Sequence, residues 1–148
     1  EANSLDMSQS IINSITTSDN EPAEPIKSDL IEDHYRQRLV KLMNLCISHW
    51  EKLTGESRLL LAEKSRVWRI SIDGGRLRTR TMDRYMSVDS LPKNPKWRNV
   101  FRTAYYVLSN CQLDDDKKSA IDTLMQQISH HLDQDKLANE STVEKLAN

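Results

Sequence analysis

Glycine is scarce in this sequence, with only three among 148 residues. Loops that cradle phosphate groups need several glycines within a short stretch, so a Walker loop and a dinucleotide-binding fingerprint are both excluded. The sequence also lacks the GxSxG, HExxH and CxxC patterns and any carboxylate-rich loop. We therefore predict that the chain is not an enzyme, has no catalytic residues and binds neither a metal nor a cofactor.

Cysteine is equally scarce, since Cys46 and Cys111 are the only two and stand far apart. Both fall on apolar helical faces, which favours buried free thiols in a reducing compartment over a disulfide. Cys46 and His49 have the spacing of a nucleophile and its base, but we expect Cys46 to point into the core. The sequence also contains no run of 18 apolar residues and no signal-peptide pattern at its start. These absences predict an intracellular protein, nuclear or cytoplasmic, with no membrane contact and no evident small-molecule substrate.

Apolar residues are also few, at 37% of the chain against an average of about 45–50%. A small helical core flanked by polar tails accounts for this deficit. Residues 1–27 are rich in Ser, Asn, Asp, Glu and Pro, which predicts a disordered acidic tail or linker. Residues 28–133 are predicted to form a single helical domain, and residues 134–148 a frayed helix or tail. Because the first residue is Glu, we expect the chain to be part of a longer protein.

Three long helices are predicted from apolar residues that recur at steps of three and four. The first begins after Ser28 as its N-cap and stops at Gly55, the second has Asn94 as N-cap and Pro95 at its first position, and the third opens with the aspartates at 114–116. Their predicted buried positions are Tyr35, Leu39, Leu42, Cys46, Trp50 and Leu53; then Trp97, Val100, Phe101, Ala104, Tyr105, Leu108 and Cys111; then Ile121, Leu124, Met125, Ile128 and Leu132.

A β-hairpin near residues 67–81 is predicted between two short helices, one capped by Ser57 and one running from Met82 to Ser87 after Thr81. Two alternating runs, VWRISI and RLRTRT, flank the letters DGG. Asp-Gly suits the positive φ angles of a type I′ turn. The predicted fold is therefore mainly α, a small helical bundle with one antiparallel hairpin and acidic tails on either side.

The register of this hairpin is predicted from its two faces. A two-residue loop at Asp73-Gly74 places Ile70 opposite Leu77 and Arg69 opposite Arg78. This register separates an apolar face from an arginine face, whereas a three-residue loop mixes them, and burial normally specifies register. We expect the hairpin to pack through Trp68, Ile70, Ile72 and Leu77 and to expose Arg69, Ser71, Arg76, Arg78 and Arg80.

The charges of the chain are strongly segregated, although its net charge is only −1. Residues 1–33 carry a net −7 and residues 114–148 a net −4, whereas residues 34–55 carry +3 and residues 56–102 carry +7. A basic middle between acidic ends fits an anionic partner or shielding by the tails themselves.

The arginine face is the sharpest candidate site, because like charges directly opposite each other on a sheet are destabilising unless an anion neutralises them. Phosphate or a carboxylate-rich peptide would do so, since arginine binds both in a bidentate manner. A second basic cluster near the start of the third long helix would complete a composite site if it lay on the same side. The predicted partner-binding or anion-binding residues are Arg69, Arg76, Arg78, Arg80, Arg84, Lys96 and Arg98.

Two functions share this predicted surface. The first is a non-catalytic protein–protein interaction domain of a larger intracellular regulatory protein, which binds an acidic protein or peptide. The alternative is a domain that binds DNA or RNA. A third interpretation assigns the arginines no partner outside the chain: they form a solvated face or pair with Asp83, Asp89 or the aspartates at 114–116.

Overall fold

A computed structural model describes residues 27–147 of the chain. All of the predicted acidic tail except Lys27 lies outside these described residues. The chain divides into a first unit, Glu1–Leu30, and a second unit, Ile31–Asn148. The second unit contains the core, the hairpin and every candidate site residue.

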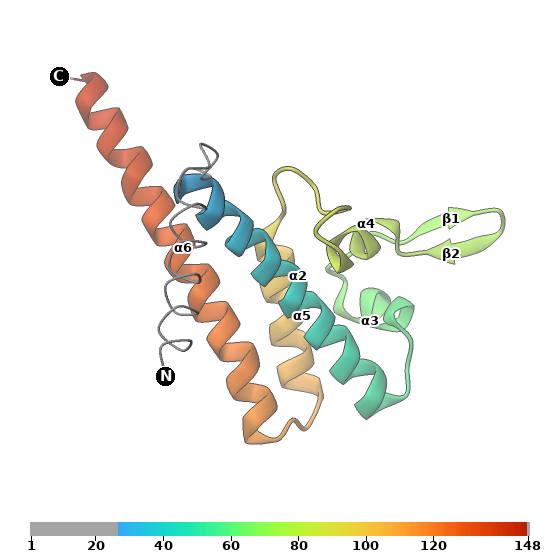
Figure 1. Ribbon diagram of the computed structural model, residues 1–148. Coiled ribbons are helices and arrows are strands. Elements are labelled where there is room, and N and C mark those ends of the chain that lie inside the picture. Colours follow the sequence, from blue (N-terminus) through green and yellow to red (C-terminus); the bar gives the residue numbers. More distant parts are fainter. Residues whose placement is uncertain (1–26, 148) are drawn as a thin grey trace, which may run out of the picture. The chain divides into compact units, whose positions relative to one another are not determined.

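The fold is mainly helical with one two-stranded hairpin, as the sequence predicts (Figure 1). The elements in chain order are α2 (Lys27–Thr54), α3 (Arg58–Ser65), β1 (Ser71–Asp73), β2 (Arg76–Arg78), α4 (Arg80–Asp83), the 3-10 turn η1 (Arg84–Met86), α5 (Trp97–Asn110) and α6 (Asp115–Ala147). Within residues 27–147, no helix has the length and apolar character needed to cross a membrane.

The core is formed mainly by the three long helices α2, α5 and α6, together with residues of α3, α4, η1 and the loops beside them. Its buried side chains include Leu39, Leu42, Met43 and Cys46 of α2, Val100, Ala104 and Val107 of α5, and Ile121, Leu124 and Ile128 of α6. Five of the six positions predicted for α2 are buried, and only Leu53, in the last turn, is exposed. Gly55 then ends the helix with a φ of +71°, a left-handed conformation that glycine adopts without a steric penalty.

Helix α5 differs from the prediction at its start and in its buried face. It begins at Trp97 with Lys96 in the N-cap position, and the Lys96 amide donates a 2.8 Å hydrogen bond to the Tyr85 hydroxyl. The predicted cap at Asn94 is therefore wrong. Of its predicted positions, Val100, Phe101, Ala104 and Cys111 are buried, but Tyr105 is 57% exposed, so the prediction for Tyr105 is wrong. Thr103 and Val107, which were not predicted, are fully buried.

Helices α2 and α6 both extend further than their predicted signals. Helix α2 already includes Lys27, so Ser28 is a helical residue and not the N-cap. Helix α6 begins after Asp114, whose Oδ1 accepts a 2.9 Å hydrogen bond from the Lys117 amide. The helix continues to Ala147 through the segment that we predicted as a frayed helix or tail.

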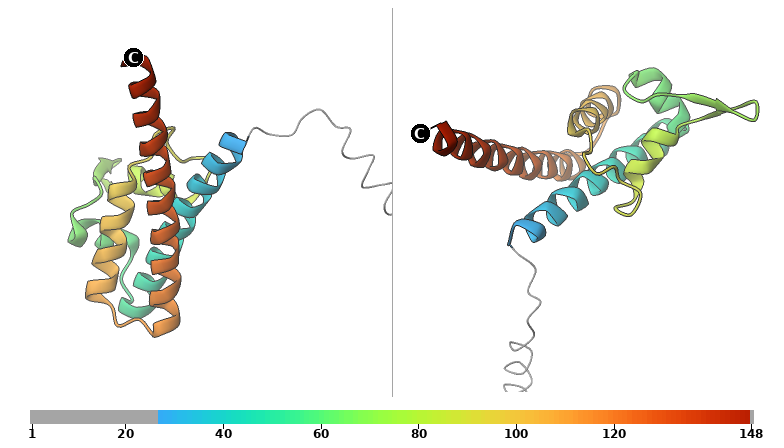
Figure 2. Two further views of the ribbon diagram at one scale, coloured as in Figure 1. Left: turned by 90° about the vertical axis from the view of Figure 1, so that its left-hand side faces the viewer. Right: turned by 90° about the horizontal axis from the view of Figure 1, so that it is seen from above.

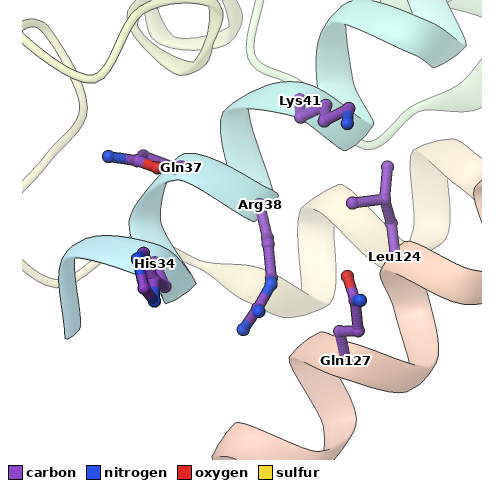
Figure 3. A pocket seen from close by; sticks show the side chains of 6 residues that line it. All are labelled: His34, Gln37, Arg38, Lys41, Leu124 and Gln127. Carbon is purple, nitrogen blue, oxygen red and sulfur yellow. The ribbon is translucent and has the colours of Figure 1, made fainter. Parts of the chain in front are cut away.

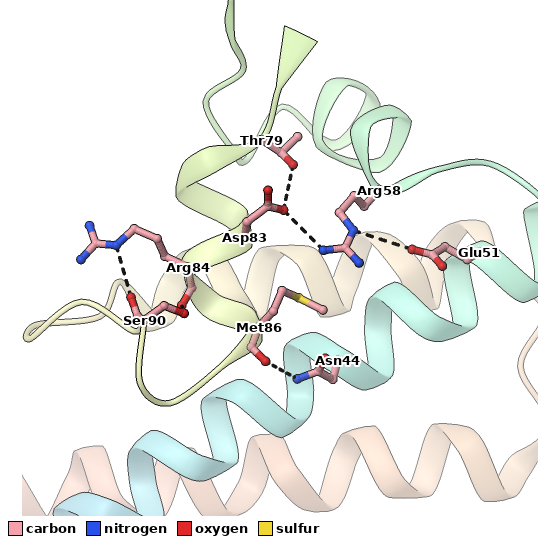
Figure 4. Close-up of polar contacts among 8 residues, drawn as sticks. All are labelled: Asn44, Glu51, Arg58, Thr79, Asp83, Arg84, Met86 and Ser90. Carbon is pink, nitrogen blue, oxygen red and sulfur yellow. Dashed lines mark hydrogen bonds and ion pairs between the residues drawn. The ribbon is translucent and has the colours of Figure 1, made fainter. Parts of the chain in front are cut away.

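The short elements α4 and η1 are held against α2 and α3 by polar contacts (Figure 4). Asp83 of α4 accepts a hydrogen bond of 3.0 Å from Thr79 and pairs with Arg58 of α3 at 3.4 Å. Asn44 of α2 donates a 3.0 Å hydrogen bond to the Met86 carbonyl. Helix α4 begins at Arg80, so the short helix that we expected from Met82 starts two residues earlier.

Candidate functional site

The hairpin has a two-residue loop, but the loop is Gly74-Gly75 and not Asp73-Gly74. Strands β1 and β2 pair Ser71 with Arg78, Ile72 with Leu77, and Asp73 with Arg76. The two glycines have φ angles of +58° and +77°. A type I′ turn needs positive φ at both central residues, and Gly-Gly meets this need without the strain that Asp73 would incur. The predicted register is therefore wrong.

The corrected register changes which charges face each other. Arg78 lies opposite Ser71 instead of Arg69, and Arg76 lies opposite Asp73. Asp73 also forms an ion pair with Arg80. The like-charge pair that we expected is absent between these strands. The pairing shifts by two residues in total, one on each strand, and side chains alternate between faces with a period of two. The two predicted faces therefore keep their members: the arginines share one face, and Ile72 and Leu77 share the other.

The outer part of the hairpin has no packing partner in residues 27–147. Figure 2 shows it extending away from the helices. Trp68 is buried and Ile70 packs partly against the core, but Ile72 is 76% exposed and Leu77 is 51% exposed. The prediction that Ile72 and Leu77 pack the hairpin is wrong. Burial cannot set the register of strands that bury nothing, so the turn sets it instead.

The root of the hairpin is fixed firmly to α5. The indole N–H of Trp68 donates a 2.7 Å hydrogen bond to Thr103 Oγ1, and both side chains are buried. The Trp68 ring also meets Tyr85 edge to face, with 4.7 Å between the ring centroids. The role of Thr103 could not be predicted from local sequence patterns, because its partner Trp68 lies 35 residues away along the chain.

Four of the seven predicted site residues belong to the hairpin and its borders: Arg69, Arg76, Arg78 and Arg80. All four are exposed. Within residues 27–147, the side chains of Arg69, Arg76 and Arg78 have no ion-pair or hydrogen-bond partner, so their predicted pairing with aspartates of the chain is not seen.

Arg84, Lys96 and Arg98 have different surroundings. The Nε of Arg84 donates a 3.2 Å hydrogen bond to the Ser90 carbonyl (Figure 4). The Arg98 guanidinium lies over the Trp97 ring, 4.7 Å from its centroid, at a surface pocket that Lys96 also lines. In the described part of the chain, no side-chain hydrogen bond or ion pair connects these residues to the hairpin arginines, although the Arg84 backbone amide donates a hydrogen bond to the Arg80 carbonyl at the end of α4.

A further basic location lies between α2 and α6, and the sequence did not point to it. His34, Gln37, Arg38 and Lys41 line one side of a surface pocket, and Leu124 and Gln127 of α6 line the other (Figure 3). Their spacing on α2 matches a solvated helix face, so only the packing of α6 shows that these residues border a hollow.

The Cys46 thiol and the His49 ring are both buried. Burial raises the pKa of Cys46 to about 12, so its thiol stays protonated at neutral pH. Neither ring nitrogen of His49 has a hydrogen-bond partner in the described residues, and burial lowers its pKa. Within residues 27–147, no group of three or more His, Cys, Asp or Glu side chains could hold a metal ion.

Comparison with known proteins identifies one informative relative. The chain matches no protein-family model and no curated protein. Among solved structures it is similar to the DNA-binding domain of the sensor histidine kinase ChiS from Vibrio cholerae, with 32% sequence identity and a TM-score of 0.67. The match covers 70% of this chain and 97% of that domain. The chain therefore belongs to the same family as the ChiS DNA-binding domain.

Proposed function

We propose that this chain is a non-catalytic DNA-binding domain of a larger regulatory protein, and that the hairpin arginines contact the DNA. The observation that carries the proposal is the match to 97% of a DNA-binding domain at 32% identity. It supports the nucleic-acid alternative over an acidic protein partner. The acidic partner, like a nuclear or cytoplasmic location, stays a prediction.

The charge of the hairpin fits a polyanion. Arg76 and Arg78 project from the same face of β2, about 7 Å apart along the strand. Neither guanidinium is neutralised within the described residues, so a contact with phosphate needs no internal ion pair to break. Duplex DNA presents one negative charge for about every 1.7 Å of its axis, and arginine binds phosphate in a bidentate manner. Both side chains could therefore contact one sugar–phosphate backbone.

The position of the hairpin also favours DNA over a flat protein surface. It extends away from the helices (Figure 1), whereas its root is fixed through Trp68 and Thr103. A narrow, projecting and basic element can enter a groove between two rows of phosphates. A firm root limits the entropy that is lost when the element is positioned there.

The test is a fluorescence-anisotropy titration of a labelled duplex of about 30 bp, at about 50 and 200 mM salt. The variant is Arg76→Ala/Arg78→Ala. The matched control is Lys118→Ala/Lys136→Ala, which removes two exposed cations from α6. We expect the arginine variant to bind at least about tenfold more weakly at low salt, and its log K–log salt slope to fall by about 1.8. We expect the affinity and the salt slope of the lysine control to change much less.

Two results would count against the proposal, the first against DNA binding itself and the second against the hairpin arginines as its contact surface. One is no binding to duplex or single-stranded DNA even at the lower salt concentration. The other is an equal loss in the arginine variant and the lysine control, which would indicate a response to net charge alone. Binding of an acidic peptide that competes with the duplex would favour the protein-partner prediction instead.

A further inference from the structure

The hairpin carries an exposed apolar pair beside its arginines. Ile72 and Leu77 lie directly opposite each other across the two strands, so their Cβ atoms are about 4.5–5.5 Å apart. Ile72 is 76% exposed and Leu77 is 51% exposed. The two side chains form one apolar surface on the face opposite Arg76 and Arg78, and at least half of each side chain is exposed to solvent.

This surface is costly for a free protein. A short two-stranded ribbon with an apolar face invites pairing with other chains, and most such ribbons are protected by polar side chains or by a covering element. A large exposed apolar patch generally marks an interaction site. The other face of the same ribbon carries Arg76 and Arg78, which form no ion pair within the described residues, so an occupant that is both anionic and partly apolar fits the two faces.

The dimensions of the ribbon select one groove of the duplex. The major groove, about 12 Å wide, admits a two-stranded β-ribbon, whereas the minor groove, about 6 Å wide, is too narrow unless the DNA deforms. The Gly74-Gly75 turn adds no side chain to the tip, and a Cβ placed at either glycine would meet nothing within 4 Å. The tip is therefore slender and is not used for packing within the described chain.

We propose that the hairpin enters the major groove tip first and that Ile72 and Leu77 contact thymine methyl groups there. This inference rests on the proposed DNA-binding function. The thymine C5-methyl is the apolar group that base pairs present in the major groove, and aliphatic side chains recognise it. Arg76 and Arg78, on the other face, then lie toward the phosphates of a groove wall. The apolar pair would confer a preference for A·T base pairs, and the arginines would confer affinity without sequence preference.

The test removes the methyl group alone. Duplexes of alternating dA-dT are compared with duplexes in which deoxyuridine replaces every thymidine, since this change alters the major groove and leaves the minor groove unchanged. Alternating dG-dC duplexes with and without 5-methylcytosine are also compared, to test whether a methyl group added at the same position raises the affinity of the chain for the duplex. We expect the wild-type chain to bind the methylated member of each pair about fivefold more tightly.

The matching variant is Ile72→Ser/Leu77→Ser, and Val88→Ser is the control for loss of an exposed apolar side chain elsewhere. All three positions are exposed, so we expect both variants to fold. The hairpin variant should still bind duplex DNA but should lose most of the methyl preference, whereas Val88→Ser should keep it.

The outcomes distinguish a failure of this inference from a failure of the proposed DNA-binding function. Equal binding of thymine and uracil duplexes by the wild-type chain would overturn the inference and leave DNA binding intact. Absence of binding to every duplex would overturn both. If sedimentation shows that the wild-type chain self-associates and the Ile72→Ser/Leu77→Ser variant does not, the apolar pair serves a second copy of the chain and the inference fails.

Discussion

The hydrogen bond from Trp68 Nε1 to Thr103 Oγ1, 2.7 Å long and buried, connects the root of the hairpin to the middle of α5. Thr103 is oriented for this role because its own hydroxyl donates a 2.8 Å hydrogen bond to the Asn99 carbonyl, one turn earlier. The direction in which the hairpin leaves the helices is thus coupled to the core. A change at Thr103 should therefore affect both stability and DNA binding.

Thr103→Val is expected to lower the free energy of unfolding by about 1–3 kcal/mol, because it keeps the side-chain shape but leaves the buried Trp68 N–H without an acceptor. Urea denaturation followed by tryptophan fluorescence measures the loss. Thr123→Val, at an exposed position on α6, is the control and should change stability by less than about 0.5 kcal/mol. Equal losses at the two positions would show that the Trp68 contact is not the cause.

Arg36 is expected to stabilise the segment that leads into α5. Its guanidinium donates hydrogen bonds of 2.9, 3.2 and 3.1 Å to the carbonyls of Pro92, Lys93 and Leu91. Hydrogen bonds to charged groups are among the stronger ones, so Arg36→Met should cost about 2 kcal/mol in thermal or urea unfolding. Arg38→Met, on the same helix, removes the same charge without this contact. If both variants lose the same free energy of unfolding, the contact between Arg36 and the loop does not stabilise the fold.

Asp73→Asn is expected to strengthen DNA binding. The Asp73 carboxylate faces Arg76 across the ribbon and forms an ion pair with Arg80, so it offsets positive charge where we propose that phosphate binds. Removing the carboxylate should tighten binding about threefold at low salt, and the gain should shrink as salt screens it. Asp89→Asn is the matched control, since it makes the same change in net charge outside the hairpin. A gain of the same size in the control would refute a local effect.

His49 is expected to make stability depend on pH below about 6.5. Burial lowers the pKa of His49, assisted by Lys117 and Lys52 and opposed by Asp114. The unfolded chain, with a histidine pKa near 6.5, therefore takes up a proton more readily than the folded chain as pH falls. The free energy of unfolding should have its full value above about pH 6.5 and should decline toward pH 5. A series of thermal melts between about pH 5 and 7.5 measures this decline.

His49→Leu is the variant that tests this cause. It removes a buried ring whose two nitrogens have no partner in the described residues, so it should flatten the decline and raise stability at pH 5. His130→Leu removes a solvent-exposed histidine and should leave the pH dependence as it is. A decline that persists in His49→Leu would assign the pH effect to another group.

The helices could be predicted from the sequence because their signal is local. The apolar steps from Tyr35 to Trp50 identify the buried face of α2 without any knowledge of its neighbours. The burial of Thr103 could not be predicted in this way, since a threonine on a helix carries no sign that a distant tryptophan needs an acceptor. The prediction for α5 instead gave weight to Tyr105, an aromatic residue that the structure leaves exposed.

The two faces of the hairpin could be predicted from the sequence, but the pairing of residues across its strands could not. The alternating run RLRTRT places Arg76 and Arg78 on one face in either register, since moving the loop by one residue on each strand preserves the faces. Which residues lie opposite them depends on the turn, and the backbone preference of Gly74-Gly75 decided it. The surroundings of Lys96, which lines a surface pocket with Trp97 and Arg98, depend on how α5 packs, and the spacing of residues along the sequence does not encode this.

The absence of packing on the outer hairpin also has a consequence for how the domain moves. Strands β1 and β2 pair only with each other in the described chain, so their amide protons can exchange with solvent through local opening while the helices stay folded. Hydrogen exchange should therefore be fast between residues 71 and 78 and slow at Leu42 or Val107. A protease could cut the hairpin and abolish DNA binding in a domain whose melting temperature barely changes, so a stable fold is no assurance of an active one.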